Sequence, residues 1–194
     1  MINYPIDNLL YQNTIQSLFV ILLKEGVSPY LVGGCVRDAL LGKKNKDIKD
    51  IDVAVNIVPN KIIEILNKYN FQYEDYGYKY GSIATKIEDK KFQITTLRED
   101  INPTGRHTNI IFTNDLFKDA KRRDFTINAI YLSSAGNFKD PFNGRQDLEE
   151  KKIRFIDNIE DRIKEDFLRI FRYYRFLGLF EKPKLIKEYE DILS

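Results

Sequence analysis

The sequence predicts an α+β domain followed by helices alone. Of the 194 residues, 43% are apolar and 31% charged, which is typical of a soluble globular chain with one full domain and part of another. Segments with strand-like and helical spacing are mixed up to about residue 158, and only helical spacing follows. No Gly/Ser/Pro-rich linker and no internal repeat divides the chain. We therefore expect a mixed, mostly antiparallel sheet flanked by helices in residues 1–150 and the first helices of an all-α unit in residues 151–194.

The first elements alternate between helix and strand around a pair of glycines. Apolar residues in 9–25 recur at a roughly helical period and stop at Gly26, which predicts a helix. A short strand at 30–34 then enters a tight turn, and a helix follows over 35–42. The segment 51–55 predicts the next strand.

The middle of the chain predicts a helix, a hairpin and a loop. Residues 60–70, which follow a proline, have the spacing of an amphipathic helix. Two β-rich segments, 81–89 and 92–100, flank a turn and predict a β-hairpin. A proline and a glycine within residues 100–115 predict a mobile loop.

The last third of the chain becomes helical. A short helix is expected around RRDFTINA at 122–129, then a strand at 129–133 and a turn at 140–144. Residues 166–177 have the pattern of an amphipathic helix with an apolar arc opposite a basic arc. The apolar arc consists of Phe167, Ile170, Phe171, Tyr174 and Leu177, and the basic arc of Arg169, Arg172 and Arg175.

Composition argues against several classes of protein. No run of about 18 uncharged apolar residues is present, so no membrane partner is expected. The N-terminus lacks the basic-then-apolar layout of a secretory signal, which favours a cytoplasmic location. One cysteine, Cys35, and one histidine, His107, rule out an internal disulfide framework and argue against a Cys/His zinc site. Any metal is therefore expected to have oxygen ligands.

Two aspartates on one predicted strand are candidate metal ligands. Asp50 and Asp52 lie two positions apart, so their side chains point to the same face. Neighbouring carboxylates repel each other, and a divalent cation such as magnesium relieves this repulsion with the oxygen ligands it prefers. For the bare motif, two solvated aspartates at the end of a strand are the alternative.

A glycine pair just before these aspartates is a candidate phosphate site. Gly33 and Gly34 lie where a strand meets a helix, and their missing Cβ atoms allow backbone N–H groups to approach a phosphate. Arg37, about one helical turn further on, can reach the same anion. A plain helix-entry turn with a surface arginine is the alternative. The succession of strand, glycine turn, arginine-bearing helix and Asp-x-Asp strand favours a site for both phosphate and metal.

These residues carry a family resemblance. LVGGCVRDALLG followed by KDIDVA resembles the signature of the class II tRNA nucleotidyltransferases, or CCA-adding enzymes, and of the related bacterial poly(A) polymerases. Later segments resemble further motifs of that family in the family's order: TTLREDINPTGRHTNIIFT, DAKRRDFTINAIYL, DPFNGRQDLEEKKIRF and EDFLRIFRYYRF. The resemblance covers roughly residues 30–177. It implies a polymerase-β-like nucleotidyltransferase head in 1–150 and the start of a helical neck in 151–194, with body and tail absent.

The resemblance implies transfer of a nucleotide from ATP or CTP to the 3′ hydroxyl of a tRNA, with release of pyrophosphate. Asp50 and Asp52 would bind two Mg²⁺ ions, one activating the attacking hydroxyl and the other neutralising the triphosphate. The glycine pair and Arg37 would cradle the triphosphate, and Arg123 would add donors suited to phosphate. Asp124 would orient its neighbour rather than bind metal.

The resemblance also implies that Asp166 and Arg169 select the base. A carboxylate can accept from the exocyclic amine of cytosine or adenine, whereas uracil and guanine place a carbonyl oxygen there. A spacing of three residues predicts that Asp166 and Arg169 share one helical turn. Arg172 and Arg175 are expected to hold phosphate or orient Asp166.

Two further observations concern a flexible segment and the residue Gln93. Arg98, Asp100, Gly105 and Arg106 match the family's flexible segment, where a hinge could couple nucleotide choice to motion. The family usually has an acid where this chain has Gln93, so the acidity that supports a second metal ion is in doubt.

Two other functions remain open at this stage. The same head could belong to a poly(A) polymerase that acts repeatedly on RNA 3′ ends. It could also be a catalytically silent remnant that binds nucleotide or RNA without chemistry. A separate polypeptide that supplies the body and tail is a further expected partner.

Overall fold

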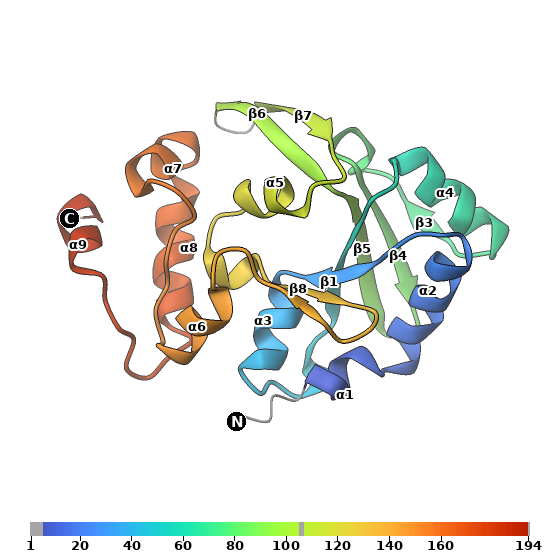
Figure 1. The fold of residues 1–194 in the computed structure, drawn as a ribbon, viewed down its shortest axis with the longest axis horizontal. Helices are drawn as coiled ribbons and strands as arrows, with labels where there is room; N and C mark the ends of the chain where they lie inside the picture. Colours follow the sequence, from blue (N-terminus) through green and yellow to red (C-terminus); the bar gives the residue numbers. More distant parts are fainter. Residues whose placement is uncertain (1–5, 105–106, 194) are drawn as a thin grey trace.

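The computed structural model describes residues 6–104 and 107–193 and contains one large sheet (Figure 1). This seven-stranded sheet has the order β3-β4-β5-β2-β1-β8-β9. Its strands are β1 (Tyr30–Val32), β2 (Asp50–Val55), β3 (Tyr73–Glu74), β4 (Ser82–Ile87), β5 (Lys90–Thr96), β8 (Tyr131–Ser133) and β9 (Phe138–Lys139). Only β2 and β5 are parallel, and the other neighbours are antiparallel. The predicted α+β class with a mixed, mostly antiparallel sheet is confirmed.

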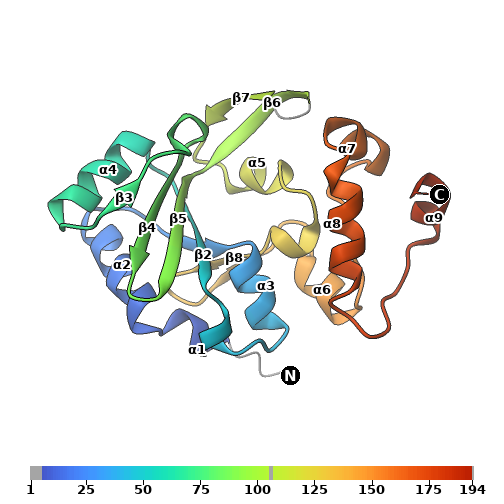
Figure 2. The same cartoon turned by 180° about the vertical axis from the view of Figure 1, so that it is seen from behind.

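Helices cover one face of the sheet, as the two opposite views show (Figures 1 and 2). They are α1 (Ile6–Leu10), α2 (Asn13–Lys24), α3 (Gly34–Leu40) and α4 (Pro59–Lys68). The helices bury apolar stripes against the strand residues that point the same way, including Ile51 and Val53 of β2 and Ile94 of β5. This packing fixes the pleat of β2, because neighbouring side chains on a strand must point to opposite faces. Asp50 and Asp52 are thereby directed to the other face.

The other face is covered only in part. A second apolar cluster, which includes Val32, Ala54 and Tyr131, lies beneath α5 (Leu116–Lys121). Further along β4 and β5 the side chains on this face are polar, and Lys86, Lys91 and Gln93 are exposed. We call this uncovered part, formed by β2, β5 and β4, the open face.

Two predicted segments differ from the structure. The predicted loop at 100–115 is wrong, because β6 (Arg98–Thr104) and β7 (His107–Phe112) form a two-stranded antiparallel hairpin. Its register shifts between Ile101 and Thr104, so the proline lies in an irregular part of β6 rather than in a long loop. The predicted helix over 122–129 is also wrong: α5 ends at Lys121, and only Thr126–Asn128 form a 3₁₀ turn.

Helices follow the sheet at the C-terminal end. They are α6 (Gly144–Glu149), α7 (Ile159–Glu165), α8 (Leu168–Leu177) and α9 (Lys187–Leu193). Aromatic packing holds α8 against the head: Phe125 lies 4.6 Å from Phe155 and 5.3 Å from Phe176, measured between ring centroids. None of the helices in the described ranges is long and apolar enough to cross a bilayer.

Candidate active site

Asp50 and Asp52 project from β2 onto the open face. In the sheet register Asp52 lies opposite Val32 on β1 and Gln93 on β5. Asp50 is exposed and Asp52 is half-buried, and neither carboxylate makes a hydrogen bond or ion pair with a described residue. Burial raises the pKa of Asp52; the positive charge of Arg123 opposes this rise and the negative charge of Asp50 adds to it.

This pair fits a hard divalent cation. Two adjacent carboxylates without cationic partners offer oxygen ligands and gain most from an added positive charge. Within the described ranges, no group of three or more His, Cys, Asp or Glu side chains could hold a metal ion. Asp50 and Asp52 would therefore supply only part of a coordination shell, with water or a bound triphosphate supplying the rest.

Gly33 allows the glycine turn to touch the carboxylate. Its φ of +74° lies in the region that favours glycine. A Cβ atom at this position would lie 2.9 Å from Oδ2 of Asp52 and 3.7 Å from Nη1 of Arg123. At Gly34, by contrast, the nearest atom to such a Cβ would be Nη2 of Arg37 at 3.5 Å, an ordinary contact. The turn, the acid and Arg123 therefore converge at Gly33.

Arg37 is held in place from three directions. Its guanidinium donates to Asp38 Oδ1 at 2.8 and 2.6 Å and to Asn128 Oδ1 at 2.8 Å. The same group lies 4.8 Å from the ring centroid of Phe176 on α8. Because its side chain is only 12% exposed, Arg37 presents a fixed positive charge next to the glycine turn.

A buried acid orients Arg123. Asp119 is 1% exposed and accepts from Arg123 at 3.3 Å, from Arg122 at 2.9 Å and from the Tyr131 hydroxyl at 2.6 Å. Tyr131 in turn accepts from Nε of Arg123 at 3.0 Å. Burial alone would raise the pKa of Asp119, but the two guanidiniums and the hydroxyl lower it to about 2.

Asp119 and Tyr131 were missed in the sequence analysis. The spacing of four residues between Asp119 and Arg123 was the available signal, because acids and bases at that distance meet on a helix. Tyr131 carried no such signal, since only the sheet brings it to Arg123.

The structure places Asp166 differently from the prediction. It lies between α7 and α8 in an extended conformation, and its Oδ1 accepts from the backbone N–H of Leu168 at 3.0 Å. The prediction that Asp166 and Arg169 share one helical turn is therefore wrong, because Asp166 lies outside α8. Arg169 donates instead to Glu165 at 2.5 Å, whereas Arg172 donates to Asp166 at 2.7 Å.

Arg172 links Asp166 to the glycine turn through a chain of polar contacts. It lies 3.5 Å from Oδ2 of Asp124, whose Oδ1 accepts from Asn128 at 3.1 Å. Asn128 accepts from Arg37, as described above. This polar chain, Asp166–Arg172–Asp124–Asn128–Arg37, joins α8 to α3.

Arg175 and Arg98 approach the site from opposite sides. Arg175 is exposed, and its guanidinium lies 4.8 Å from the Phe176 ring that Arg37 also contacts. Arg98 lies at the base of the β6–β7 hairpin, 3.3 Å from Asp100, and also donates to the carbonyl of Tyr80. Gly105 and Arg106, the other two residues of the expected flexible segment, lie outside the described residues.

The open face beside Asp52 is hollowed. A cavity of about 350 Å³ is lined by Asp52, Gln93, Arg98, Arg122 and Arg123, among others. Three guanidiniums against one carboxylate make its walls suitable for an anion. Gln93 donates to Ser82 Oγ at 2.9 Å, so its amide is tied to β4.

Comparison with known proteins agrees with this geometry. Residues 29–154 match the family model described as the poly A polymerase head domain. The chain belongs to this family. The family resemblance inferred from the motifs is thereby confirmed, while the individual site roles and the division near residue 150 stay predictions.

Relatives of this head domain include CCA-adding enzymes. Mitochondrial CCA tRNA nucleotidyltransferase 1 of Homo sapiens is 40% identical over 176 residues, which is 90% of this chain and 40% of the relative. The CCA-adding enzyme of Oceanobacillus iheyensis is 39% identical over 157 residues, 80% of this chain and 38% of the relative. The chain thus spans about two fifths of the length of these curated relatives.

Solved structures with this head domain are similar in fold. The crystal structure of the Bacillus stearothermophilus CCA-adding enzyme in complex with CTP has a TM-score of 0.72 and 34% identity, covering 86% of this chain and 39% of that one. A tRNA nucleotidyltransferase complexed with a primer tRNA and an incoming ATP analog also has a TM-score of 0.72, with 31% identity, covering 90% and 48%.

The glycine turn yields a first prediction. Gly33→Ala should destabilise the head by about 1–3 kcal/mol, because alanine is strained at this backbone conformation and its Cβ would displace Asp52. Gly34→Ala is the matched control and should change the free energy of unfolding by less than about 1 kcal/mol, since its Cβ meets only ordinary contacts. Urea unfolding monitored by circular dichroism measures both. Equal losses for the two variants would contradict the close approach at Gly33.

Asp119 yields a second prediction. Its folded-state pKa of about 2 lies below the ordinary 3.8, so its contribution is complete above about pH 4 and is lost as the pH falls toward 2. Asp119→Asn should cost about 2–3 kcal/mol at neutral pH and much less at about pH 2.5. The exposed Asp161→Asn is the control. A loss for Asp119→Asn that does not shrink in acid would show that charge is not the cause.

Proposed function

We propose that this chain is the catalytic head of a template-independent RNA nucleotidyltransferase that adds C, A or both to the 3′ end of tRNA. The observation that carries the proposal is the unpaired Asp50–Asp52 pair, with Asp52 next to Gly33 of the glycine turn and with Arg37 and Arg123 close by. In the reaction the 3′ oxygen of the RNA bonds to the α-phosphorus of CTP or ATP, the α–β phosphoanhydride bond breaks, and pyrophosphate leaves. The hydroxyl proton passes to solvent.

Asp50 and Asp52 would hold Mg²⁺. The bound metal supplies a lowered pKa for the attacking hydroxyl and positive charge for the triphosphate. Binding of a cation favours the ionised form of Asp52, whose pKa burial has raised. Gln93 leaves the site with two acidic ligands rather than three.

The arginines would bind the triphosphate. Arg37 and Arg123 are both oriented before substrate arrives, by Asn128 and Asp38 in one case and by Asp119 and Tyr131 in the other. Oriented guanidiniums lose little entropy on binding phosphate and stabilise charge that develops on the leaving group. Backbone N–H groups at the glycine turn would add donors.

Asp166 would select the base. Its carboxylate accepts hydrogen bonds and therefore suits the exocyclic amine of cytosine or adenine, and it repels the carbonyl of uracil or guanine. Arg172 holds this carboxylate in place and so has the orienting role. Arg175 is exposed and can bind phosphate, whereas Arg169 would have to exchange its bond to Glu165 for one to a ring nitrogen. Both arginines have the fork of donors that such contacts require.

The names of the relatives favour tRNA as the substrate over other RNA. The curated relatives cited above are described as CCA-adding or CCA tRNA nucleotidyltransferases. A cytoplasmic location and a separate polypeptide for the body and tail stay predictions, since mitochondrial relatives exist and the chain spans about two fifths of the length of the curated relatives.

The catalytic role of the aspartates gives a third prediction. With Mg²⁺, a tRNA that lacks its terminal C-C-A should be extended by a few nucleotides with CTP and ATP, and Asp52→Ala should slow this at least about 100-fold. Asp161→Ala, an exposed acid on α7, is the control and should be unaffected. Gel analysis of product length and a pyrophosphate assay provide the readouts. The fold of Asp52→Ala should be as stable as the parent, because it loses a partly buried charge without a partner.

Three outcomes separate the alternatives. A long ladder with ATP alone would identify a poly(A) polymerase. Nucleotide binding by calorimetry without pyrophosphate release would identify a silent remnant. No transfer even when the C-terminal part of a bacterial relative is added as a second polypeptide would end the proposal.

A further inference from the structure

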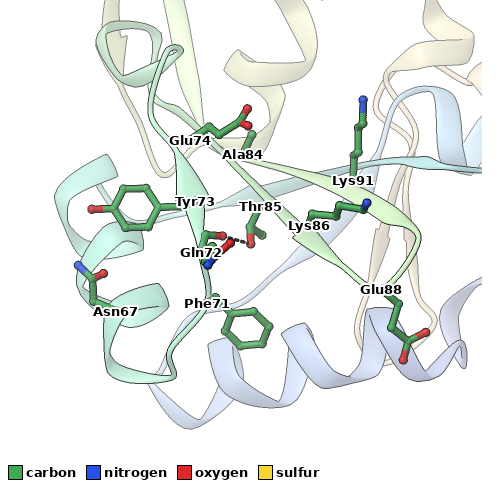
Figure 3. A pocket seen from close by; sticks show the side chains of 10 residues that line it. All are labelled: Asn67, Phe71, Gln72, Tyr73, Glu74, Ala84, Thr85, Lys86, Glu88 and Lys91. Carbon is green, nitrogen blue, oxygen red and sulfur yellow. Dashed lines mark hydrogen bonds between the residues drawn. The ribbon is translucent and has the colours of Figure 1, made fainter.

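Two lysines stand in one row with the first aspartate. The sheet register pairs Asp50 on β2 with Lys91 on β5, and Lys91 with Lys86 on β4. Paired residues on neighbouring strands project to the same face, so all three side chains point onto the open face. Both lysines are exposed, and Figure 3 shows their amino groups extending away from the strands without a hydrogen-bond partner among the residues drawn.

The register gives Lys91 one opposite charge, Asp50, but the two side chains form no ion pair in the described part of the chain. Neither Lys86 nor Lys91 makes an ion pair there; the nearby Lys49 uses Asp89 as its partner instead. Like charges directly opposite each other destabilise a sheet. Protection of a sheet edge does not account for Lys91, because β5 lies between β4 and β2. An anionic ligand over the pair would relieve the repulsion.

The reaction geometry indicates which anion this is. In phosphoryl transfer the attacking and leaving oxygens lie on opposite sides of the phosphorus. The groups suited to the leaving pyrophosphate, the glycine turn and Arg37, lie on the β1 and α3 side of β2. The sheet order puts β5 and β4 on the opposite side. An RNA that attacks from the side opposite the glycine turn would therefore approach over β5 and β4.

We propose that Lys86 and Lys91 form a binding site for the phosphodiester groups of the RNA strand just upstream of its attacking 3′ hydroxyl. The proposal rests on the proposed function. A hollow of about 870 Å³ next to the pair leaves room for a single strand (Figure 3). Glu74, Ala84, Lys86 and Lys91 line it from the open face, and the rest of its lining comes from α4, the β3 edge, β4 and the β4–β5 turn: Asn67, Phe71, Gln72, Tyr73, Thr85 and Glu88. Contacts of this kind follow the backbone and do not depend on base identity.

The test compares three double variants of the whole chain. Lys86→Ala/Lys91→Ala removes the pair, and Lys86→Arg/Lys91→Arg keeps its charge. Lys24→Ala/Lys61→Ala is the matched control, because these exposed lysines lie on α2 and α4, which cover the other face. The probe is a fluorescent single-stranded RNA of about 12 nucleotides, with anisotropy measured at several KCl concentrations. Calorimetry with ATP or CTP measures nucleotide binding separately.

The alanine pair should bind RNA roughly twentyfold more weakly at about 0.1 M KCl and should reduce the slope of log affinity against log salt by about 1.4, the value for two phosphate contacts on a single strand. Nucleotide affinity should not change. The arginine pair and the control should keep the parent's affinity and slope, and the alanine pair should melt no lower than the parent. An unchanged RNA affinity and slope for the alanine pair, or no RNA binding by the parent, would overturn the inference.

Transfer assays distinguish this failure from failure of the proposed function. If the parent extends tRNA and the alanine pair has the same KM for tRNA as the parent, the proposed function is supported and the lysine site is excluded. If RNA binding depends on the lysines but the parent releases no pyrophosphate with any nucleotide, the lysine site stands and the proposed activity falls.

Discussion

The absence of cationic partners for Asp50 and Asp52 is the constraint on which the site depends. Several arginines lie near the site, yet four of them are already matched with other acids: Arg123 with Asp119, Arg37 with Asp38, Arg172 with Asp166 and Arg169 with Glu165. Half-burial of Asp52 beside another carboxylate is unfavourable in the free protein. The site thus keeps its negative charge available for a cation while its positive charges stay fixed for an anion.

The second feature is the mechanical link between the head and α8. Phe176 packs on Phe125 in the core and carries Arg37 and Arg175 against its ring. The polar chain from Asp166 to Arg37 runs beside this aromatic contact. A displacement of α8 by a bound base would therefore be felt at Arg37. In the proposed function, base selection at Asp166 and triphosphate binding at Arg37 would share this connection, which is the arrangement that a selective transferase needs.

Patterns within short segments of the sequence predicted the features that depend on interactions between residues close together in the chain. Helical spacing, glycine turns and the alternation of β2 predicted the main elements through residue 96, apart from α1 and β3, and the direction of Asp50 and Asp52. The failures involve long-range contacts. The β6–β7 hairpin forms although its segment contains a proline and a glycine, because the two strands pair with each other. Phe167, just before α8, and Phe171 on α8 are 67% and 74% exposed, whereas Tyr173 and Phe176 are buried. This face of α8 is the one that packs on the aromatic core of the head.

The rows of the open face show how Gln93 and the lysines are related. In one row Asp52 is followed by Gln93 and Ala84, and in the next Asp50 is followed by Lys91 and Lys86. A glutamate at position 93 would place a third negative charge beside Asp52 and two residues along β5 from Lys91, where it could form an ion pair with that lysine. The amide instead bonds to Ser82 and leaves Lys91 unpaired. In the proposed site, the neutral residue at position 93 would thus keep the basic row available for a phosphate, and Asp50 and Asp52 would hold a metal without a third acid.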